Sequence, residues 1–233
     1  FIAIADGDLG AAREASEWMA RRGWEHRAAL NEEQPGVAEA LKMAEDRFVG
    51  PKPEGVMNPV PADGSPLQAP PTDTDHAHLG PIVLMDVGDN IGGGSSADST
   101  FILAEAQRMG VQSFLQSLYD PEAVEACLKA GVGNDVTLDV GGKTDDMHGS
   151  PVQVTGRVRA ITDGDFEATR PNHGGGRFFS CGTAVRLDTT DGHTLLLTSR
   201  RIGNTTREQM YHIGIWPEEF RIVVAKGVVS PRP

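Results

Sequence analysis

Apolar residues follow one another almost without interruption over Ile82–Val87. A run of this kind is typical of a strand that is buried on both faces of a sheet. Apolar residues then recur at helical spacing as far as Gly110, and Ser96 or Asp98 is the expected N-cap of that helix. Val111–Leu118 has the composition of the next strand. The order strand, helix, strand predicts a parallel unit with a right-handed crossover.

A second helix is expected directly after this unit. Asp120 is a good N-cap, and Pro121 suits the first helical position because its φ angle is already helical. Beyond Ala130 the pattern turns strand-like, with strands expected at residues 136–140, 152–158, 178–187, 194–199 and 222–225, a hairpin turn at 188–193 and a short helix at 206–211. The sequence therefore predicts an α/β fold: a mixed sheet with a parallel βαβ unit followed by an antiparallel, strand-rich half.

Residues 1–49 are expected to form a strand and two helices that lead into this domain. Phe1–Ala5 is apolar and β-prone, and helical spacing extends over Leu9–Leu30 and Val37–Phe48. The domain itself is expected to occupy residues 82–233.

The intervening residues, 50–81, have a different composition. Eight prolines lie there among Gly, Ser, Asp and Thr, with few large apolar side chains. Such a segment buries too little surface to offset its ordering entropy, so a long surface loop or a partly disordered insertion is expected. Its Asp73, Asp75, His76 and His78 could bind a metal. No fixed geometry is implied, however, and a solvated cluster is the favoured interpretation.

Charge and composition exclude several classes of protein. The 233 residues are 39% apolar, which is enough for a sizeable core. The formal net charge of −12, without a visible basic patch, argues against a nucleic-acid partner. No apolar run reaches the roughly 18 residues of a membrane-spanning helix, so no membrane partner is expected.

The two cysteines indicate a reducing compartment. Cys127 and Cys181 have no metal-ligand spacing and are expected to be reduced thiols, which favours a cytoplasmic location. No charged leader precedes the apolar start at Phe1, so a signal peptide is not expected. Strand-like residues at both ends of the sequence suggest a piece of a longer chain. A homo-oligomer is left open.

The glycine-rich turn after the first predicted buried strand is the strongest candidate for a functional feature. Gly92, Gly93 and Gly94 would let backbone N–H groups approach a ligand, and the helix that follows adds a dipole favourable to anionic oxygen. Asp89 and Asn90 offer hydrogen-bonding groups beside them. The alternative is a tight corner capped by these two side chains. The binding interpretation is favoured because three glycines cost more chain entropy than one turn requires.

A second loop, Gly141–Pro151, also follows a predicted strand. Lys143 brings a positive charge, Asp145 a carboxylate, and His148 a group that titrates near neutral pH. This loop could serve catalysis or substrate anchoring, or it could be a connection whose side chains bond to backbone; the residues alone do not decide. His173 lies in a third glycine-rich segment.

Common catalytic motifs are missing from the sequence. The spacings of phosphate-binding loops and of the dinucleotide fingerprint do not occur, so a nucleotide site or a sugar or nucleotide kinase is not supported. His-Glu-x-x-His, Cys-x-x-Cys and Gly-x-Ser-x-Gly are absent as well, so neither a self-contained zinc site nor an esterase nucleophile can be named.

Several of these motifs, taken together and in order, resemble the C-terminal region of the MlrC (microcystinase C) family. The segments that carry the resemblance are Asp89–Thr100, Asp120–Val124, Gly141–Asp145, His148–Val152 and Leu197–Arg201. Ala5–Asp8 and the helix after it resemble the segment that precedes that region. Two features depart from the pattern: residues 50–81 form a longer stretch than is usual, and Ile91 stands where the family often has proline.

The resemblance implies a zinc-dependent metallopeptidase of the M81 type, which acts on peptide or amide bonds. In such proteins the zinc ligands belong to an N-terminal domain, which would be a further part of the same chain. The residues that carry over here are proposed to bind substrate and line the cleft facing that domain: Asp89, Asn90, Gly92, Gly93, Gly94, Lys143, Asp145 and His148. No catalytic or metal-ligating residue is assigned in this sequence, and this part alone is expected to be inactive. The alternative is a non-catalytic module that binds a small anion or serves assembly.

Overall fold

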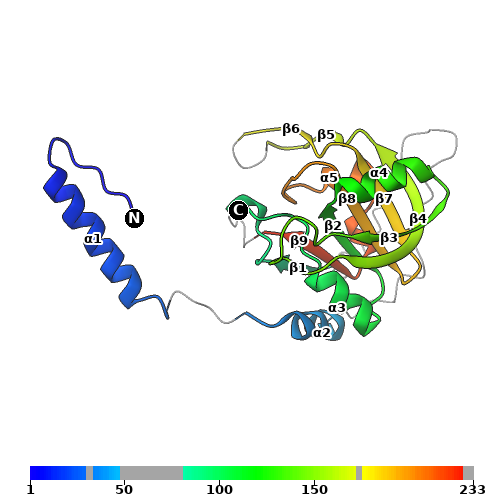
Figure 1. Ribbon diagram of the computed structural model, residues 1–233, viewed down its shortest axis with the longest axis horizontal. Helices are drawn as coiled ribbons and strands as arrows, with labels where there is room; N and C mark the ends of the chain where they lie inside the picture. The colour runs from blue at the N-terminus through cyan, green and yellow to red at the C-terminus, as the bar shows by residue number, and fades with distance from the viewer. Residues whose placement is uncertain (30–33, 48–80, 172–174, 228–233) are drawn as a thin grey trace. The chain divides into compact units, whose positions relative to one another are not determined.

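The computed structural model describes residues 1–29, 34–47, 81–171 and 175–227 (Figure 1). The chain divides into two compact units, Phe1–Gly36 and Val37–Pro233. The first unit contains helix α1 (Leu9–Glu25), whose start is capped by Asp8: its carboxylate accepts from the Ala11 amide at 2.9 Å. The strand predicted at residues 1–5 is wrong, because this segment has no strand partner and Phe1 instead lies against α1.

The second unit is built around a seven-stranded sheet. Its strands are β1 (Ile82–Asp86), β2 (Phe114–Tyr119), β3 (Asp135–Val140), β4 (Val152–Thr162), β7 (Ala184–Thr189), β8 (His193–Thr198) and β9 (Ile222–Lys226). They lie in the order β1-β9-β2-β8-β7-β4-β3, parallel from β1 to β8 and antiparallel from β8 to β3. The predicted fold class, a mixed sheet with a parallel part and an antiparallel part, is confirmed.

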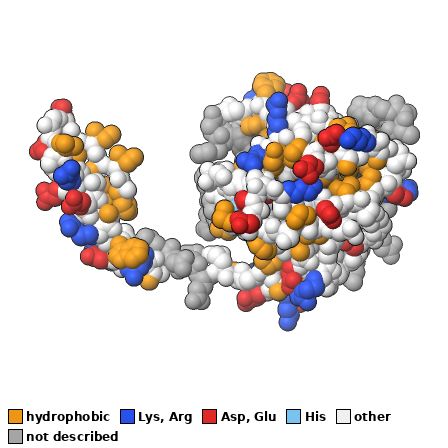
Figure 2. Space-filling model, viewed as in Figure 1, with side chains coloured by type: hydrophobic (Ala, Val, Ile, Leu, Met, Phe, Trp, Pro, Cys, Tyr) orange, Lys and Arg blue, Asp and Glu red, His pale blue; other side chains and the backbone are white. Residues whose placement is uncertain are grey.

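Helices and a small second sheet complete this unit. The helices are α2 (Val37–Arg47), α3 (Phe101–Met109), α4 (Pro121–Ala130) and the short α5 (Glu208–Tyr211). Strands β5 (Asp165–Glu167) and β6 (Phe178–Ser180) pair with each other, and two 3-10 turns occur, η2 (Ile91–Gly93) and η3 (Pro217–Glu219). On the face seen in Figure 2, Lys and Arg side chains of this unit are scattered among acidic and apolar ones.

Strand β9 occupies an unexpected position between β1 and β2. Ile222 stands opposite both Ile82 of β1 and Phe114 of β2, so the last strand of the described chain joins the first two. The sequence predicts that β1 and β2 are parallel members of one sheet, and this is confirmed. It does not predict that they are separated by another strand.

Two apolar clusters fill the two faces of the sheet. The larger cluster includes Phe114 and Leu103 of α3, and the smaller includes Leu115, Met210 and Ile215. Because successive side chains of a strand point to opposite faces, the neighbours Phe114 and Leu115 anchor different clusters. The central strands β2 and β8 are thus buried on both faces.

Three predictions about individual elements are wrong. β1 is an edge strand with Val83 and Met85 52% and 37% exposed, so it is not buried on both faces. Helix α3 has Thr100 as its N-cap in place of Ser96 or Asp98. The segment 178–187 splits into β6 and β7, which belong to different sheets.

Some predicted features fall outside the described residues. These are the stretch 48–80, with its Asp73, Asp75, His76 and His78, and His173 of the third glycine-rich segment. Within the part of the chain that is described, none of the helices combines the length and apolar character needed to cross a membrane.

Candidate functional site

Asp89, directly after β1, organises the segment that follows it. Its carboxylate is fully buried and accepts hydrogen bonds from the amides of Ala97 and Ser99, both at 2.8 Å. The ammonium of Lys226, at the end of β9, lies 2.7 Å from the same carboxylate. Burial alone would raise the pKa of Asp89, but Lys226 and the donating groups outweigh it and lower the pKa. Asp89 is therefore a charged anchor for the loop.

The glycine turn is a compact structure next to this anchor. The amide of Gly93 donates to the carbonyl of Asn90, and the amide of Gly94 donates to the carbonyl of Ile91, both at 2.9 Å. Gly94 has a φ of +93°, a conformation that side chains other than glycine rarely adopt. The three glycines are exposed, yet two of their amides are used within the turn. Fewer backbone donors face outward than the sequence suggests.

Asp98 joins this region to the loop that follows β3. One of its carboxylate oxygens accepts from the amides of Lys143 and Thr144, each at 2.9 Å, and its carbonyl accepts from Gly142 at 2.8 Å. Burial tends to raise the pKa of Asp98, but the hydrogen bonds from these two amides help to lower it overall. Two loops that are more than 40 positions apart are thus held together by one buried carboxylate.

The same loop caps the start of α3. The Thr100 amide donates to the carbonyl of His148 at 3.0 Å, and the Thr100 hydroxyl donates to the carbonyl of Ser150 at 2.7 Å. Ser96 and Asp98 do not cap the helix: both are buried and precede Thr100, the residue at the N-cap position. The N-terminus of α3, which was expected to attract an anionic oxygen of a ligand, is therefore covered by backbone carbonyls of the loop 141–151.

Lys143 is directed toward the start of α4. Its ammonium lies 2.9 Å from Asp120, whose carboxylate also accepts from the amides of Ala123 and Gly141 at 2.9 Å. The predicted N-cap role of Asp120 is confirmed. The Lys143 side chain is 25% exposed and its charge is compensated by this partner. It does not join the glycine turn through any contact among the described residues.

Asp145 and His148 form a hydrogen-bonded pair in the same loop. Nδ1 of the imidazole lies 2.8 Å from the carboxylate, and because a carboxylate only accepts, Nδ1 is the donor. The amides of Met147 and His148 also donate to this carboxylate, at 2.8 and 3.1 Å. The hydrogen bond to Asp145 raises the pKa of His148, with smaller contributions from the charges of Asp89 and Asp98.

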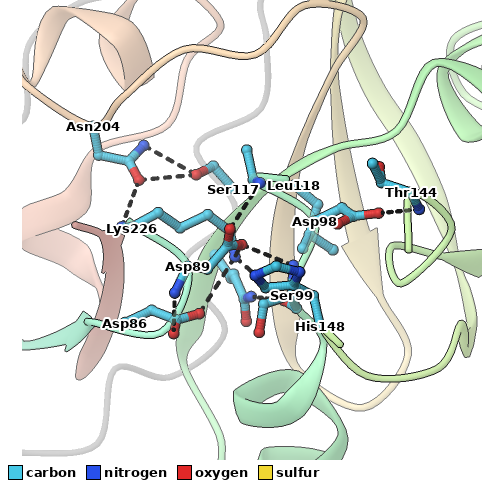
Figure 3. Close-up of polar contacts among 12 residues, drawn as sticks. Asp86, Asp89, Asp98, Ser99, Ser117, Leu118, Thr144, His148, Asn204 and Lys226 are labelled. Carbon is cyan, nitrogen blue, oxygen red and sulfur yellow. Dashed lines mark hydrogen bonds and ion pairs between the residues drawn. The ribbon is translucent and has the colours of Figure 1, made fainter. Parts of the chain in front are cut away.

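Sequence reasoning missed the buried residues that support Asp89. Lys226 also lies 3.5 Å from Asp86 and 3.3 Å from the carbonyl of Ser99, and its own amide donates to Asn204 at 3.0 Å. Asn204 in turn bonds to Ser117 of β2 at 3.0 Å. Figure 3 shows Lys226 extending between Asn204 and the two carboxylates. The sequence held one signal for this pair: Lys226 ends an apolar strand, and a lysine that is buried in such a position requires an acidic partner.

The structure thus brings Asp89, Asp98 and the Asp145–His148 pair into one region, with Asn90 and the glycines at its exposed rim. These acidic groups are already held by Lys226 or by backbone amides. No group of three His, Cys, Asp or Glu among the described residues could hold a metal ion. The residues described here therefore do not fit a zinc ion.

The class defined by this architecture is an α/β domain with a mixed sheet and two loops joined over the start of α3. The chain belongs to the MlrC family: the sequence model of the MlrC C-terminus matches residues 84–233. The resemblance stated from the sequence is confirmed.

Two relatives of this chain are considerably longer proteins. Over 152 residues it is 30% identical to microcystinase C of Sphingomonas sp, a match that covers 63% of this chain and 28% of that protein. A crystal structure from Mesorhizobium sp. BNC1, named "Putative metallopeptidase", superposes with a TM-score of 0.70 at 22% identity, over 95% of this chain and 38% of that one. At this identity the structure supports the fold alone. The chain spans well under half the length of both proteins.

Proposed function

We propose that this chain is the C-terminal, cleft-forming part of an MlrC-like zinc-dependent hydrolase of peptide or amide bonds. Its family membership and its similarity to microcystinase C support a hydrolase of this class. The zinc and its ligands are proposed to belong to an N-terminal domain of the same longer protein. The cytoplasm is the proposed location, and a homo-oligomer stays open.

The observation that carries this proposal is the bridge made by Asp98. Its hydrogen bonds to Lys143 and Thr144 hold the glycine turn and the loop after β3 in a fixed relation. Active sites require polar groups fixed by their surroundings, because a geometry that has already been organised costs no ordering at the moment of reaction. Two loops with backbone anchoring of this kind would make a rigid wall for a substrate.

The predicted substrate-binding residues then divide into two roles. Asn90, Gly92 and His148 are proposed to contact polar groups of a peptide or amide substrate. A supporting group is proposed to hold them in place: Asp89, Gly93, Gly94, Lys143 and Asp145. This division follows from burial and from existing partners, since Asp89 and Lys143 already have compensating charges.

The partition of the metal is tested by zinc analysis of the purified 233-residue chain after exposure to zinc and dialysis. The expected result is less than stoichiometric zinc and no cleavage of linear peptides. One tightly held zinc per chain would contradict the proposed division. Activity is expected from the longer protein that also contains the metal-binding part. Inactivity of that protein over a broad panel of peptides and amides would favour the alternative, a non-catalytic module that binds a small anion.

The role of the glycine turn is tested by Gly93→Val. A Cβ at this position would come within 3.1 Å of the Asn90 side chain and crowd the turn. In the longer protein the expected result is a higher KM for a peptide substrate with an unchanged melting temperature. Gly36→Val is the matched control, because a Cβ there meets nothing within 4 Å. A change in stability without a change in KM would support the alternative that the glycines only allow a tight turn and bind no ligand.

A further inference from the structure

His148 differs from His193 and His212 in its electrostatic surroundings. His193 and His212 have lowered pKa values because burial opposes their charged forms. His148 instead has a carboxylate on Nδ1, and its side chain is 16% exposed. It is thus mostly enclosed, reaches the surface, and is paired in a way that favours the imidazolium.

The ring of His148 has a fixed orientation. Asp145 accepts three hydrogen bonds, from Nδ1 of the imidazole and from the amides of Met147 and His148. The carbonyl of His148 is held in turn by the Thr100 amide at the start of α3. With the backbone and Nδ1 both restrained, the ring has little freedom left, and its second nitrogen points in one direction.

That second nitrogen, Nε2, has no hydrogen-bond partner among the described residues. The side chain is 16% exposed, so solvent reaches the ring. In Figure 3 the imidazole lies beside Asp89 and Ser99, and the influence of the Asp89 and Asp98 charges on its pKa agrees with that position. Nε2 carries a proton when the imidazole is charged, the form that the pairing with Asp145 favours, so a solvent-accessible proton donor is available close to the Asp89 anchor.

We propose that His148 is the general acid that protonates the leaving nitrogen of the amide, with Asp145 as its positioning residue. This assignment rests on the proposed hydrolase function. It extends that function by giving one residue of the cleft wall a chemical role. The substrate class it predicts is amides and peptides whose amine product is basic, because such nitrogens need a proton before they can leave.

The proton balance of the step is as follows. The oxygen of water bonds to the carbonyl carbon, and the C–N bond breaks with its electron pair moving to nitrogen. Nε2 of His148 donates its proton to that nitrogen, giving a free amine. The proton released by the attacking water returns the imidazole to its charged form. The sum is one water added across one amide bond, with no oxidant or reductant.

The leaving group provides a test that a structural role would not pass. A p-nitroanilide releases a weakly basic amine that needs little protonation, whereas an alkylamide of the same acyl part releases a strongly basic one. In the longer protein, His148→Gln is expected to lower kcat for the alkylamide by about 100- to 10,000-fold. The loss for the anilide is expected to be at least tenfold smaller. Met147→Ala, with a side chain that is 70% exposed in the same loop, is the control that keeps both activities.

A second measurement does not depend on activity. In the 233-residue chain, NMR titration of the histidine Cε1–H signals is expected to give His148 a pKa above the ordinary histidine value, with assignment from His148→Gln. Asp145→Asn should lower it. In the longer protein, Asp145→Asn should move the acidic and basic limbs of the kcat profile closer together by lowering the basic limb.

The outcomes separate the two proposals. If the wild-type longer protein cleaves no amide, the hydrolase function fails and the role of His148 fails with it. If the wild type is active and His148→Gln slows both substrates equally, only the assignment to His148 is overturned. A pKa for His148 that is unchanged by Asp145→Asn would also overturn it.

Discussion

Nζ of Lys226 lies 2.7 Å from Oδ2 of Asp89, and the two side chains are 1% and 0% exposed. This buried ion pair connects the end of β9 with the loop that follows β1. A charge that loses its partner in such surroundings keeps its full desolvation cost, whereas an exposed pair contributes little in either state. The pair is therefore the most sensitive point of the candidate site.

Replacing Lys226 with methionine should strongly destabilise the domain. Asp89 and Asp86 would lose their cation, and a loss of about 3–5 kcal/mol in the free energy of unfolding is expected. Urea denaturation followed by circular dichroism measures this. The control is Arg157→Met, since Arg157 and Asp135 form an exposed pair with 48% and 63% exposed side chains. Its loss should be at most about 1 kcal/mol. Equal losses for both variants would contradict the buried role of Lys226.

Asp98 should give a pH-dependent contribution to stability. Burial raises the pKa of its carboxyl, but hydrogen bonds from the amides of Lys143 and Thr144 help to lower it below the ordinary 3.8. A group with a lowered pKa stabilises the fold above its ordinary value and loses this contribution as pH falls through the folded value. The difference in unfolding free energy between wild type and Asp98→Asn, about 1–3 kcal/mol at pH 7, should therefore shrink below pH 4. A difference that stays constant down to pH 2.5 would refute this.

Gly142 should not tolerate a side chain. Its φ is +58°, and a Cβ would lie 2.6 Å from the carbonyl carbon of Ser150. Gly133 has a similar φ of +87° but open space around it. Alanine at either position carries the backbone strain, of about 1–2 kcal/mol, and only Gly142→Ala adds the clash. Thermal unfolding should show a clearly larger loss for Gly142→Ala. Equal losses would mean that the loop can shift to admit the methyl group.

Asp120 should contribute more than an ordinary helix cap. Its carboxylate accepts from Ala123, Gly141 and Lys143, so Asp120→Ala removes the cap and also leaves the buried Gly141 amide without its acceptor. A cap alone is worth about 1 kcal/mol, and a buried amide without a partner adds about 1–3. The expected total is about 2–4 kcal/mol by urea denaturation. Asp120→Asn retains an acceptor oxygen and should lose less.

The two cysteines should be unreactive in the folded protein. Burial raises the pKa of both Cys127 and Cys181 to about 11, so each is a neutral thiol at neutral pH. Only the thiolate is a good nucleophile. Reaction with a chromogenic disulfide reagent at pH 7.5 should be slow in buffer and should give two equivalents in urea. Rapid labelling of either residue in buffer would show local opening.

Much of the local structure follows from short-range signals. Asp120-Pro121 marks the start of α4 because a capping carboxylate and a fixed φ act within one turn. The hairpin from β7 to β8 follows from two strand-like runs and the turn residues at 188–193 between them. Such features need no knowledge of distant parts of the chain.

Features set by distant contacts were not predictable in this way. The exposure of Val83 depends on β1 being an edge strand, which is decided by where β9 inserts. The start of α3 depends on the carbonyl of His148, supplied by a loop 48 positions later. Asp89 was expected to face a ligand, but its partner Lys226 lies at the far end of the sequence. No local pattern of residues contains that information.

The position of β9 has a consequence for the making of the protein. The parallel half of the sheet cannot close until residues 222–226 have left the ribosome, because β9 lies between β1 and β2 and pairs with both. The carboxylate of Asp89 has no cation until the same moment. Folding of the site therefore waits for the last described strand, and contacts of such long sequence separation form slowly. A chain that ends before residue 226 would leave the buried carboxylate of Asp89 without its cation, so this loop reaches its final stability only after synthesis has passed that residue.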